Sequence, residues 1–516
     1  MTTLIARRGA STGSRPSVLL GTTVLAITVV MLIPVGFVVV TMVQTGWDVL
    51  SPLIFRVRVR ELLTNTILLV VIGVPLCVFV GVGTAWLVER TNLPGRRVWA
   101  VLFAAPLAIP AFVSSYAWVS LVPSINGLSA GLLISTLSYF PLVYLPAAAT
   151  LRGLDPAFEE TARSLGLSPV RVFLRVVLPQ LRLAVWGGGL VVGLHLLAEY
   201  GAFALIRFDT FTTAIIVQYR STFAGPAASA LGIVLTLLCV LLLTAEATTR
   251  GTARYARVGG GAARPAGRQS LGSSTVPALL ASGMLVGLAV GVPLVSIARW
   301  LRVGDPWGQP EIGGAVLQTV TLAVGGAVIT VLLAMPLAWL SVRHPSRPAK
   351  VIEASNYLAS SLPAIVIALA LVTVAIRVVP SVYQTVFTVL LAYAIIFLPR
   401  SLISVRSGLG QAPILLEEVA RSLGKSPAVA RMRVTVPLLT PAILAGAALV
   451  ALGVANELTA TLLLAPTGTR TLATQFWSAS SSVAYSDAAP YALLLILISL
   501  PTVALMAVQL RRRSAR

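Results

Sequence analysis

The sequence predicts an all-α polytopic membrane protein of about twelve transmembrane helices, arranged as two parallel repeats of six helices. Three observations support this fold class. Hydrophobic residues make up 57% of the 516 residues and charged residues only 10%, proportions that a soluble domain with a hydrated surface does not sustain. Long apolar segments recur along the whole chain, and one polar segment occurs twice.

The apolar segments are long enough to cross a hydrocarbon core roughly 30 Å thick as helices. Helices are expected because backbone groups in lipid must be satisfied within their own segment. The first segment is too long for the core of a cleavable signal peptide. The predicted spans lie near residues 17–44, 62–88, 98–122, 127–150, 183–206 and 226–248, and then near 274–298, 313–341, 351–378, 380–404, 438–464 and 488–510.

The repeated polar segment indicates a tandem duplication. Residues 159–179 read EETARSLGLSPVRVFLRVVLP, and residues 417–437, which begin 258 positions later, read EEVARSLGKSPAVARMRVTVP. An even number of spans in each copy gives both copies the same orientation in the membrane. The predicted domains are a cytoplasmic N-terminal tail (1–16), a first permease repeat (17–248), a cytoplasmic linker (249–273), a second permease repeat (274–510) and a basic cytoplasmic tail (511–516).

Each copy of the polar segment predicts a helix, a bend and a second, basic helix. Two Glu residues begin the first helix, where negative charge suits the helix dipole, and Gly166 can end it. Ser168 and Pro169 then supply an N-cap and a first-turn proline for the next helix. A small polar element joined to membrane spans suggests a docking site for another protein.

Basic residues predict the orientation of the chain. The net charge is +22, yet the basic residues do not form one patch. With the N-terminus inside, about three quarters of the 38 Lys and Arg residues lie on the inner side, as the positive-inside rule requires. Both termini and both polar segments are therefore expected in the cytoplasm, and nucleic-acid binding loses its support. Arg56, Arg58 and Arg60 lie on the outer side, and the sequence assigns them no role.

The polar segments resemble the signature, or EAA, loop of ABC importer permeases. The match includes the spacing of Glu, Ala, Gly and Pro in both copies, although Thr161 and Val419 stand where that signature has its central Ala. In that family the loop forms a coupling helix that contacts a cytoplasmic ATPase. The resemblance implies a type I importer fold and assigns ATPase coupling to Glu159, Glu160, Ala162, Gly166, Pro179, Glu417, Glu418, Ala420, Gly424 and Pro437.

The same resemblance implies partners on other chains. We expect two copies of a cytoplasmic ATPase subunit, an extracytoplasmic substrate-binding protein and the lipid of a bacterial inner membrane, with the cofactors ATP and Mg on the ATPase. The chain itself is expected to be no enzyme and to carry no cofactor. Its Gly424-Lys425-Ser426 lacks the earlier glycine of a phosphate-binding loop, because Val419 stands there.

Few ionisable residues lie within the predicted spans, and these are candidates for the translocation pathway. Glu199 and Glu457 occupy equivalent places in the fifth span of each half, where a charge is costly unless it faces a polar interior. His195 lies one helical turn before Glu199, and Tyr200 follows it. The alternative interpretation is that both Glu residues only fix helix packing through hydrogen bonds.

The solute is predicted from two shorter stretches. AEYGAFALIRFDTFTTAI (198–215) and NELTATLLLAPTGTRTLATQFW (456–477) are similar to fused two-repeat permeases of ferric-iron importers. Carboxylate and phenol oxygens suit a hard trivalent cation, and Asp209 and Asp487 could add to the two glutamates, although no metal site is assigned. Thiamine, phosphonate, polyamine or another small solute remains an alternative.

Two other classes of protein also fit the hydropathy. A secondary transporter with two parallel repeats could use an ion gradient through Glu199 and Glu457. A membrane scaffold would need no pathway at all. Uptake that depends on ATP rather than on the proton gradient separates the importer from the first class, and the paired intramembrane glutamates argue against the second.

Overall fold

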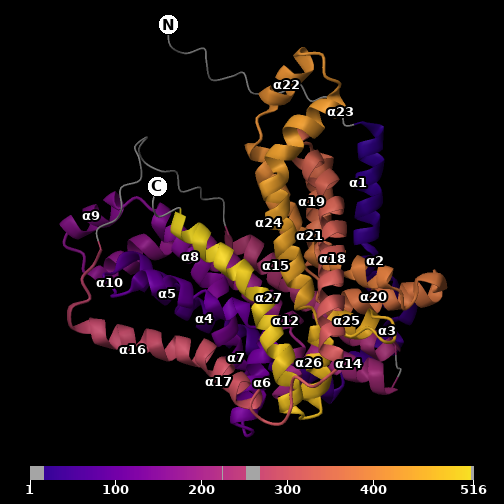
Figure 1. The fold of residues 1–516 in the computed structure, drawn as a ribbon, viewed down its shortest axis with the longest axis horizontal. Coiled ribbons are helices and arrows are strands. Elements are labelled where there is room, and N and C mark those ends of the chain that lie inside the picture. Colours follow the sequence, from indigo (N-terminus) through magenta and orange to yellow (C-terminus); the bar gives the residue numbers. More distant parts are fainter. Residues whose placement is uncertain (1–16, 223–224, 251–267, 513–516) are drawn as a thin grey trace. The chain divides into compact units, whose positions relative to one another are not determined.

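The computed structural model describes residues 17–222, 225–250 and 268–512. These residues are helical apart from turns and one isolated bridge that pairs Thr91 with Gln269. The N-terminal tail, most of the predicted linker and the last residues of the basic tail lie outside the described residues. The chain divides into two compact units, each built from two separate parts of the sequence (Figure 1).

Unit 1 comprises the chain up to Gln44 together with Gly314–Thr471. Its helices are α1 (Val18–Met31), α2 (Ile33–Thr45), α18 (Glu311–Arg343), α19 (Arg347–Ser360), α20 (Ala364–Arg377), η5 (Pro380–Val382), α21 (Val386–Gln411), α22 (Ile414–Ser422), α23 (Pro427–Ala430), η6 (Arg431–Thr435), α24 (Val436–Ala455) and α25 (Thr459–Leu464). The most extensive contact between two helices of this unit joins α21 and α24 (Figure 1).

Unit 2 comprises Thr45–Gly313 and the chain from Leu472 onward. It begins with α3 (Trp47–Ile54), α4 (Val57–Arg90), α5 (Arg96–Leu102), η1 (Ala105–Ala108), α6 (Ala111–Leu121), α7 (Gly127–Tyr139), α8 (Pro141–Gly153), α9 (Ala157–Ser164), α10 (Pro169–Val172), η2 (Phe173–Val177) and α11 (Leu178–Gln180). It continues with α12 (Arg182–Ala198), α13 (Gly201–Leu205), α14 (Phe211–Thr222), α15 (Gly225–Arg250), η3 (Gly272–Ser274), α16 (Thr275–Val286), η4 (Gly287–Gly291), α17 (Val292–Trp300), α26 (Leu472–Ser481) and α27 (Tyr485–Arg512).

The first span of each predicted repeat packs against the third span of the other repeat. In unit 1, the Asn356 amide on α19 donates a hydrogen bond of 3.1 Å to the Thr28 hydroxyl on α1. In unit 2, the hydroxyls of Ser296 on α17 and Ser120 on α6 lie 2.7 Å apart. The compact units therefore combine parts of both repeats, while the repeat boundaries predicted from the sequence remain a prediction about the duplication.

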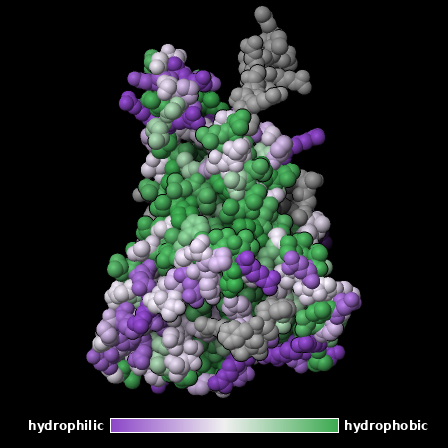
Figure 2. Space-filling model, turned by 90° about the vertical axis from the view of Figure 1, so that its right-hand side faces the viewer, coloured by the Kyte–Doolittle hydropathy of each residue, from purple (hydrophilic) through white to green (hydrophobic). Residues whose placement is uncertain are grey.

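The described helices agree with a polytopic membrane protein. Seven are long and apolar enough to cross a membrane, and up to eleven if each bent helix pair counts as one span. The last predicted span falls on α27, whose apolar part Tyr485–Pro501 is shorter than these. In the face shown in Figure 2, apolar side chains form a broad central area. Phe79 and Leu280 are examples of large apolar side chains that are exposed on the predicted spans.

Two predicted spans are sharply bent at equivalent prolines. The segment 98–122 turns by 90° before α6, and the segment 351–378 turns by 97° before α20. Pro110 and Pro363 stand at these turns, and the ψ angle of 143° at each gives it an extended backbone. Proline lacks the N–H that would continue the helical hydrogen bonds, so each helix ends there and a new one starts in another direction.

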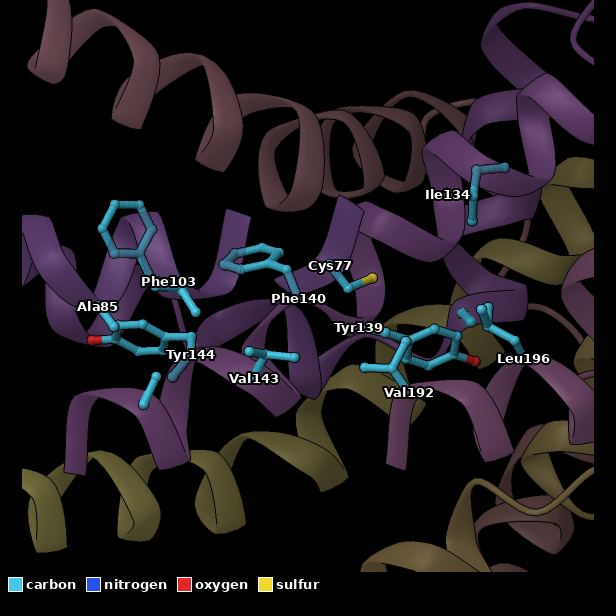
Figure 3. Packing of buried hydrophobic residues seen from close by; sticks show 14 of the residues in the cluster. Cys77, Ala85, Phe103, Ile134, Tyr139, Phe140, Val143, Tyr144, Val192 and Leu196 are labelled. Atoms are coloured by element: carbon cyan, nitrogen blue, oxygen red, sulfur yellow. The ribbon is translucent and has the colours of Figure 1, made fainter. Parts of the chain in front are cut away.

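The core of unit 2 lies where α4, α8 and α12 meet. A Cβ at Gly81 of α4 would lie 2.9 Å from the Phe140 carbonyl, and one at Gly188 of α12 would lie 3.0 Å from the Leu142 carbonyl, so both helices approach α8 closely. Tyr139, Val192 and other buried side chains fill the space along these contacts (Figure 3). This packing holds the ends of α4 and α8 beside the first polar segment.

Candidate functional site

The two polar segments, here called the first loop (159–179) and the second loop (417–437), have matching backbone conformations at their bends. Helix α9 ends at Gly166 and helix α22 ends at Gly424, with φ angles of 81° and 80°. In the first loop the Leu167 N–H donates to the Ala162 carbonyl, and in the second the Lys425 N–H donates to the Ala420 carbonyl. This is the glycine C-cap of a helix, and it places the next helix at a new angle.

A π-turn follows at equivalent positions of both loops. Phe173–Val177 and Arg431–Thr435 adopt this wider turn just before Pro179 and Pro437. Each proline lacks an N–H for the carbonyl four residues earlier, and the widened turn accommodates that loss. Both prolines are exposed and sit at the joint between the loop and the membrane helix that follows.

A buried ion pair anchors the first loop to the end of α4. The Arg90 guanidinium lies 2.9 Å from the Glu159 carboxylate, with side chains only 4% and 7% exposed. A second ion pair joins Glu89 of α4 to Arg152 of α8 at 2.6 Å. Charges buried to this extent need a close partner, so the start of α9 is fixed to the membrane helices.

The second loop is anchored by weaker contacts. Glu417, the equivalent of Glu159, accepts a hydrogen bond of 3.1 Å from the Thr435 hydroxyl within its own loop. Arg343, the equivalent of Arg90, donates instead to the Ala412 carbonyl at 3.3 Å. No residue of α22 is buried. The equivalent glutamates therefore face different surroundings.

An equivalent tryptophan supports each loop from the membrane side. In the first repeat the Trp86 ring meets Phe173 edge to face, with centroids 4.8 Å apart. In the second repeat Arg431 takes the place of Phe173, and its guanidinium lies 5.7 Å from the Trp339 ring. The tryptophan is kept while an aromatic contact has become a cation–π contact.

Both loops present exposed apolar side chains at equivalent positions. Leu165 is 77% exposed and Leu423 is 74% exposed, while Phe158 and Leu416, the residues directly before the two loops, are 43% and 45% exposed. The predicted coupling residues Glu160 and Glu418 are also exposed, whereas Ala162 is buried and Ala420 partly so. Exposed apolar side chains on an otherwise polar loop are typical of a protein interface.

The intramembrane glutamates cap short helices. The Glu199 carboxylate accepts a hydrogen bond of 2.6 Å from the Tyr139 hydroxyl and one of 2.9 Å from the Ala202 N–H at the start of α13. The Glu457 carboxylate accepts one of 2.8 Å from the Ala460 N–H at the start of α25. These bonds agree with the packing interpretation, because each carboxylate satisfies backbone groups at a helix break.

The other predicted pathway residues lie beside these glutamates. The His195 Nδ1 is 2.8 Å from the Val191 carbonyl, and its ring centroid is 5.4 Å from that of Tyr139, the partner of Glu199. Tyr200 is buried, with its ring centroid 5.0 Å from that of Trp477. The described part of the chain holds no group of three or more His, Cys, Asp or Glu residues that could bind a metal ion.

Two arginines gain an explanation that the sequence did not provide. Arg58 forms an ion pair of 2.7 Å with Asp209, so this aspartate is already engaged in unit 2. Arg400, near the middle of α21, is exposed, and a Cβ at Gly453 would lie 2.4 Å from its Nη1 atom. Glu457 interacts with Arg400 electrostatically. In the sequence, Arg400 is an arginine inside an apolar run that could have indicated a functional residue. It lies near the end of the predicted span 380–404, however, where a basic residue is expected on the inner side of the membrane.

The sequence is similar to a family of known transport proteins. The family described as binding-protein-dependent transport system inner membrane component matches residues 73–246 and 326–514. The Fe(3+)-transport system permease protein FbpB 2 of Haemophilus influenzae is 35% identical over 94% of this chain and 97% of its own length. The sulfate transport system permease protein CysT of Salmonella typhimurium is 27% identical over 43% of this chain and 88% of its own length.

Proposed function

We propose that the chain forms the translocation pathway for ferric iron, on the premise that it belongs to the family of inner membrane components of binding-protein-dependent transport systems. It is an ABC importer permease of the inner membrane with two repeats, and it is not itself an ATPase. The observation that supports ferric iron as the solute is the similarity to an Fe(3+)-transport permease over nearly the full length of both chains.

The two loops are the proposed contacts with the motor. Two cytoplasmic ATPase subunits, which carry ATP and Mg, would each receive one loop, and Leu165 and Leu423 would enter apolar grooves on them. The exposure of these leucines and the matched glycine bends support this assignment. The distribution of Lys and Arg supports a cytoplasmic position for the loops and both termini.

The solute would enter from an extracytoplasmic binding protein. Closure of the ATPase subunits on ATP would move both loops, and the membrane helices joined to them would change from one access state to another. Glu199 and Glu457 lie at helix breaks in the fifth span of each repeat, so a movement of either helix would displace a carboxylate. We assign the pathway to these glutamates with His195 and Tyr200 beside the first.

Uptake by the purified complex tests this function. The chain, its ATPase and its binding protein are reconstituted in proteoliposomes, and the entry of radioactive iron is followed. We expect uptake only when ATP, the ATPase and the iron-loaded binding protein are all present, and a protonophore should leave it unchanged. Uptake that persists without the ATPase and stops with the protonophore would instead establish a secondary transporter.

A further inference from the structure

The end of the predicted linker is hydrogen-bonded to the chain at the end of α4, within unit 2. The Gln269 N–H donates to the Arg90 carbonyl at 2.9 Å, and the Gln269 carbonyl accepts a hydrogen bond of 3.1 Å from the Asn92 N–H. The Leu271 N–H donates to the side-chain oxygen of Asn92 at 2.9 Å, across 179 positions of sequence. These bonds fix the end of the linker to the end of α4.

This attachment places two arginines beside each other. Arg268 directly precedes Gln269, and Arg96 begins α5 four residues after Asn92. Arg96 is partly buried and Arg268 is exposed. Among the charged side chains that act on Arg96, Arg268 has the largest electrostatic effect, and the two positive charges repel each other.

No acid among the described residues balances this positive charge. The carboxylate that acts on Arg96 is that of Glu89, and it already forms an ion pair of 2.6 Å with Arg152. In the part of the chain that the structure describes, neither Arg96 nor Arg268 forms an ion pair. The positive charge of Arg97 also acts on Arg96. Arginines that backbone bonds hold together without a counter-charge indicate a site for an external anion.

Exposed apolar side chains lie next to the arginines, where two predicted spans begin. Val98 of α5 is exposed two residues after Arg96. Helix α16, which follows Arg268 within seven residues, lies at the edge of unit 2 (Figure 1). Three large apolar side chains are exposed on it at intervals of four residues: Val276, Leu280 and Met284. Basic groups beside exposed apolar groups match the head group and the acyl chains of a phospholipid.

The equivalent place in the second repeat lacks the arginine pair. Ala349 follows Arg96 by 253 positions, the same offset that separates Trp339 from Trp86. Ala349 is buried, and its N–H donates to the Ser346 hydroxyl at 3.3 Å at the start of α19. Helix packing that both repeats share therefore does not account for the arginine pair of unit 2.

We propose that Arg96 and Arg268 bind the phosphate of an anionic phospholipid in the cytoplasmic leaflet, with its acyl chains along Val98 and the exposed side of α16. The inference does not depend on which solute the chain transports. A guanidinium binds phosphate oxygens through paired N–H donors. The distribution of Lys and Arg supports a cytoplasmic position for these span ends, and basic residues next to spans attract anionic lipids there.

A bound lipid would also act on the anchor of the first loop. Arg90, whose carbonyl accepts the bond from Gln269, holds Glu159 through its guanidinium. A lipid that binds only when the linker end is attached stabilises that attachment. The lipid would therefore strengthen the contacts around Arg90, at the point where the first loop joins the membrane helices.

Binding of fluorescent phosphatidylglycerol to the purified full-length chain in detergent tests the site. Arg96→Gln with Arg268→Gln should lower the affinity about thirtyfold, because each basic residue at an anionic membrane surface contributes about fivefold. Arg347→Gln with Lys350→Gln removes the same charge from exposed positions at the start of α19 and should leave the affinity nearly unchanged. Equal losses in the two double variants would show binding by overall charge and overturn the site.

Competition distinguishes a lipid from other anionic partners. Unlabelled phosphatidylglycerol should displace the probe, whereas inorganic phosphate and phosphatidylcholine at the same concentration should not. Displacement by inorganic phosphate as effective as that by phosphatidylglycerol would assign the arginines to a free anion and overturn the lipid. A double variant that keeps its lipid affinity but loses affinity for the ATPase would assign them to a protein partner and also overturn it.

The substitution Asn92→Ala tests whether the linker end builds the site. It removes the acceptor of the Leu271 N–H and leaves both arginines in the chain. We expect the phosphatidylglycerol affinity to fall about fivefold, the contribution of one arginine, because Arg268 is then no longer held beside Arg96. Ser270→Ala, at an exposed position of the same segment, is the matched control. Thermal unfolding in lipid-free detergent verifies that each variant is folded, and an unchanged affinity of folded Asn92→Ala overturns the site.

Discussion

The first and second loops share one shape but are held in place by different chemistry. In both, a left-handed glycine ends the first helix and a π-turn precedes a proline. The first is tied down by the buried Arg90–Glu159 pair, whereas the second relies on the Glu417–Thr435 hydrogen bond and the contact of Arg431 with Trp339.

The two loops therefore have in common the backbone shape that a partner protein would contact, and they differ in the contacts that attach each loop to the membrane helices. The backbone shape is set by Gly, Ser-Pro and Pro, and it is the same in both copies. The anchors lie behind the proposed contact surface, so they could diverge after the duplication without changing the surface that a partner contacts. The structure therefore predicts that substitutions at the bends affect both loops alike, and that substitutions at the anchors do not.

The largest effect is expected at the bends. Proline cannot adopt a positive φ, so Gly166→Pro and Gly424→Pro should each misplace one loop and reduce ATP-dependent uptake to background. The measurement is radioactive iron uptake together with co-purification of the ATPase. Gly153→Ala, at the end of α8 where a Cβ meets open space, is the matched control. Normal uptake by the double proline variant would exclude coupling through these loops.

The anchors should show the contrast most clearly. Glu159→Gln leaves the Arg90 charge buried without its partner, and we expect a loss of about 3–5 kcal/mol in the free energy of unfolding. Glu417→Gln removes a charge from a partly buried hydrogen bond and should cost only about 1 kcal/mol. Thermal unfolding of the purified chain in detergent compares them. Arg90→Met with Glu159→Leu should recover most of the loss, and equal effects of the two glutamine variants would refute the contrast.

The exposed leucines test docking without affecting the fold. Leu165→Asp and Leu423→Asp should each weaken ATPase binding by about 1.5–3 kcal/mol, roughly ten- to a hundredfold in affinity. Unfolding should stay unchanged because these side chains are mostly exposed. Leu165→Met serves as the conservative control, and affinity is measured by fluorescence anisotropy with labelled ATPase. Strongly unequal losses would show that the two loops do not present equivalent surfaces.

The smallest effect is expected from a substitution at the contact between Arg431 and Trp339. Arg431→Phe recreates the aromatic pair of the first repeat and exchanges one contact for another of similar strength, so the free energy of unfolding should change by less than about 1 kcal/mol. Arg433→Phe removes the same charge two residues away and controls for net charge. A loss well above this limit, measured by thermal unfolding, would mean that Arg431 has a role beyond stacking on Trp339.

Much of this architecture could be predicted from local physics. Hydropathy locates the spans because each segment must satisfy its own backbone in lipid. Glycine and proline predict the bends in the loops because their backbone limits apply in any surroundings. The duplication predicts that both loops share one shape, and the structure has the same φ angle at Gly166 and Gly424.

The rest depends on which segments meet, and hydropathy does not contain that information. Proline indicates a kink at Pro110 and Pro363, but the bends of 90° and 97° depend on neighbouring helices. Glu159 and Glu417 are equivalent in sequence, yet only one meets a buried arginine. Arg400 could be recognised as a charge within an apolar run, but its place beside Gly453 depends on a part of α24 that follows more than fifty residues farther along the chain.

The pairing of α1 with α19 has a consequence for biogenesis. Thr28 and Asn356 are separated by 328 positions, and at a synthesis rate of about 5–20 residues per second the earlier helix waits roughly 16–65 s for its partner. During that interval its Thr28 face has no native neighbour in the bilayer. A ribosome stalled after the first half would therefore leave α1 without its contact to Asn356.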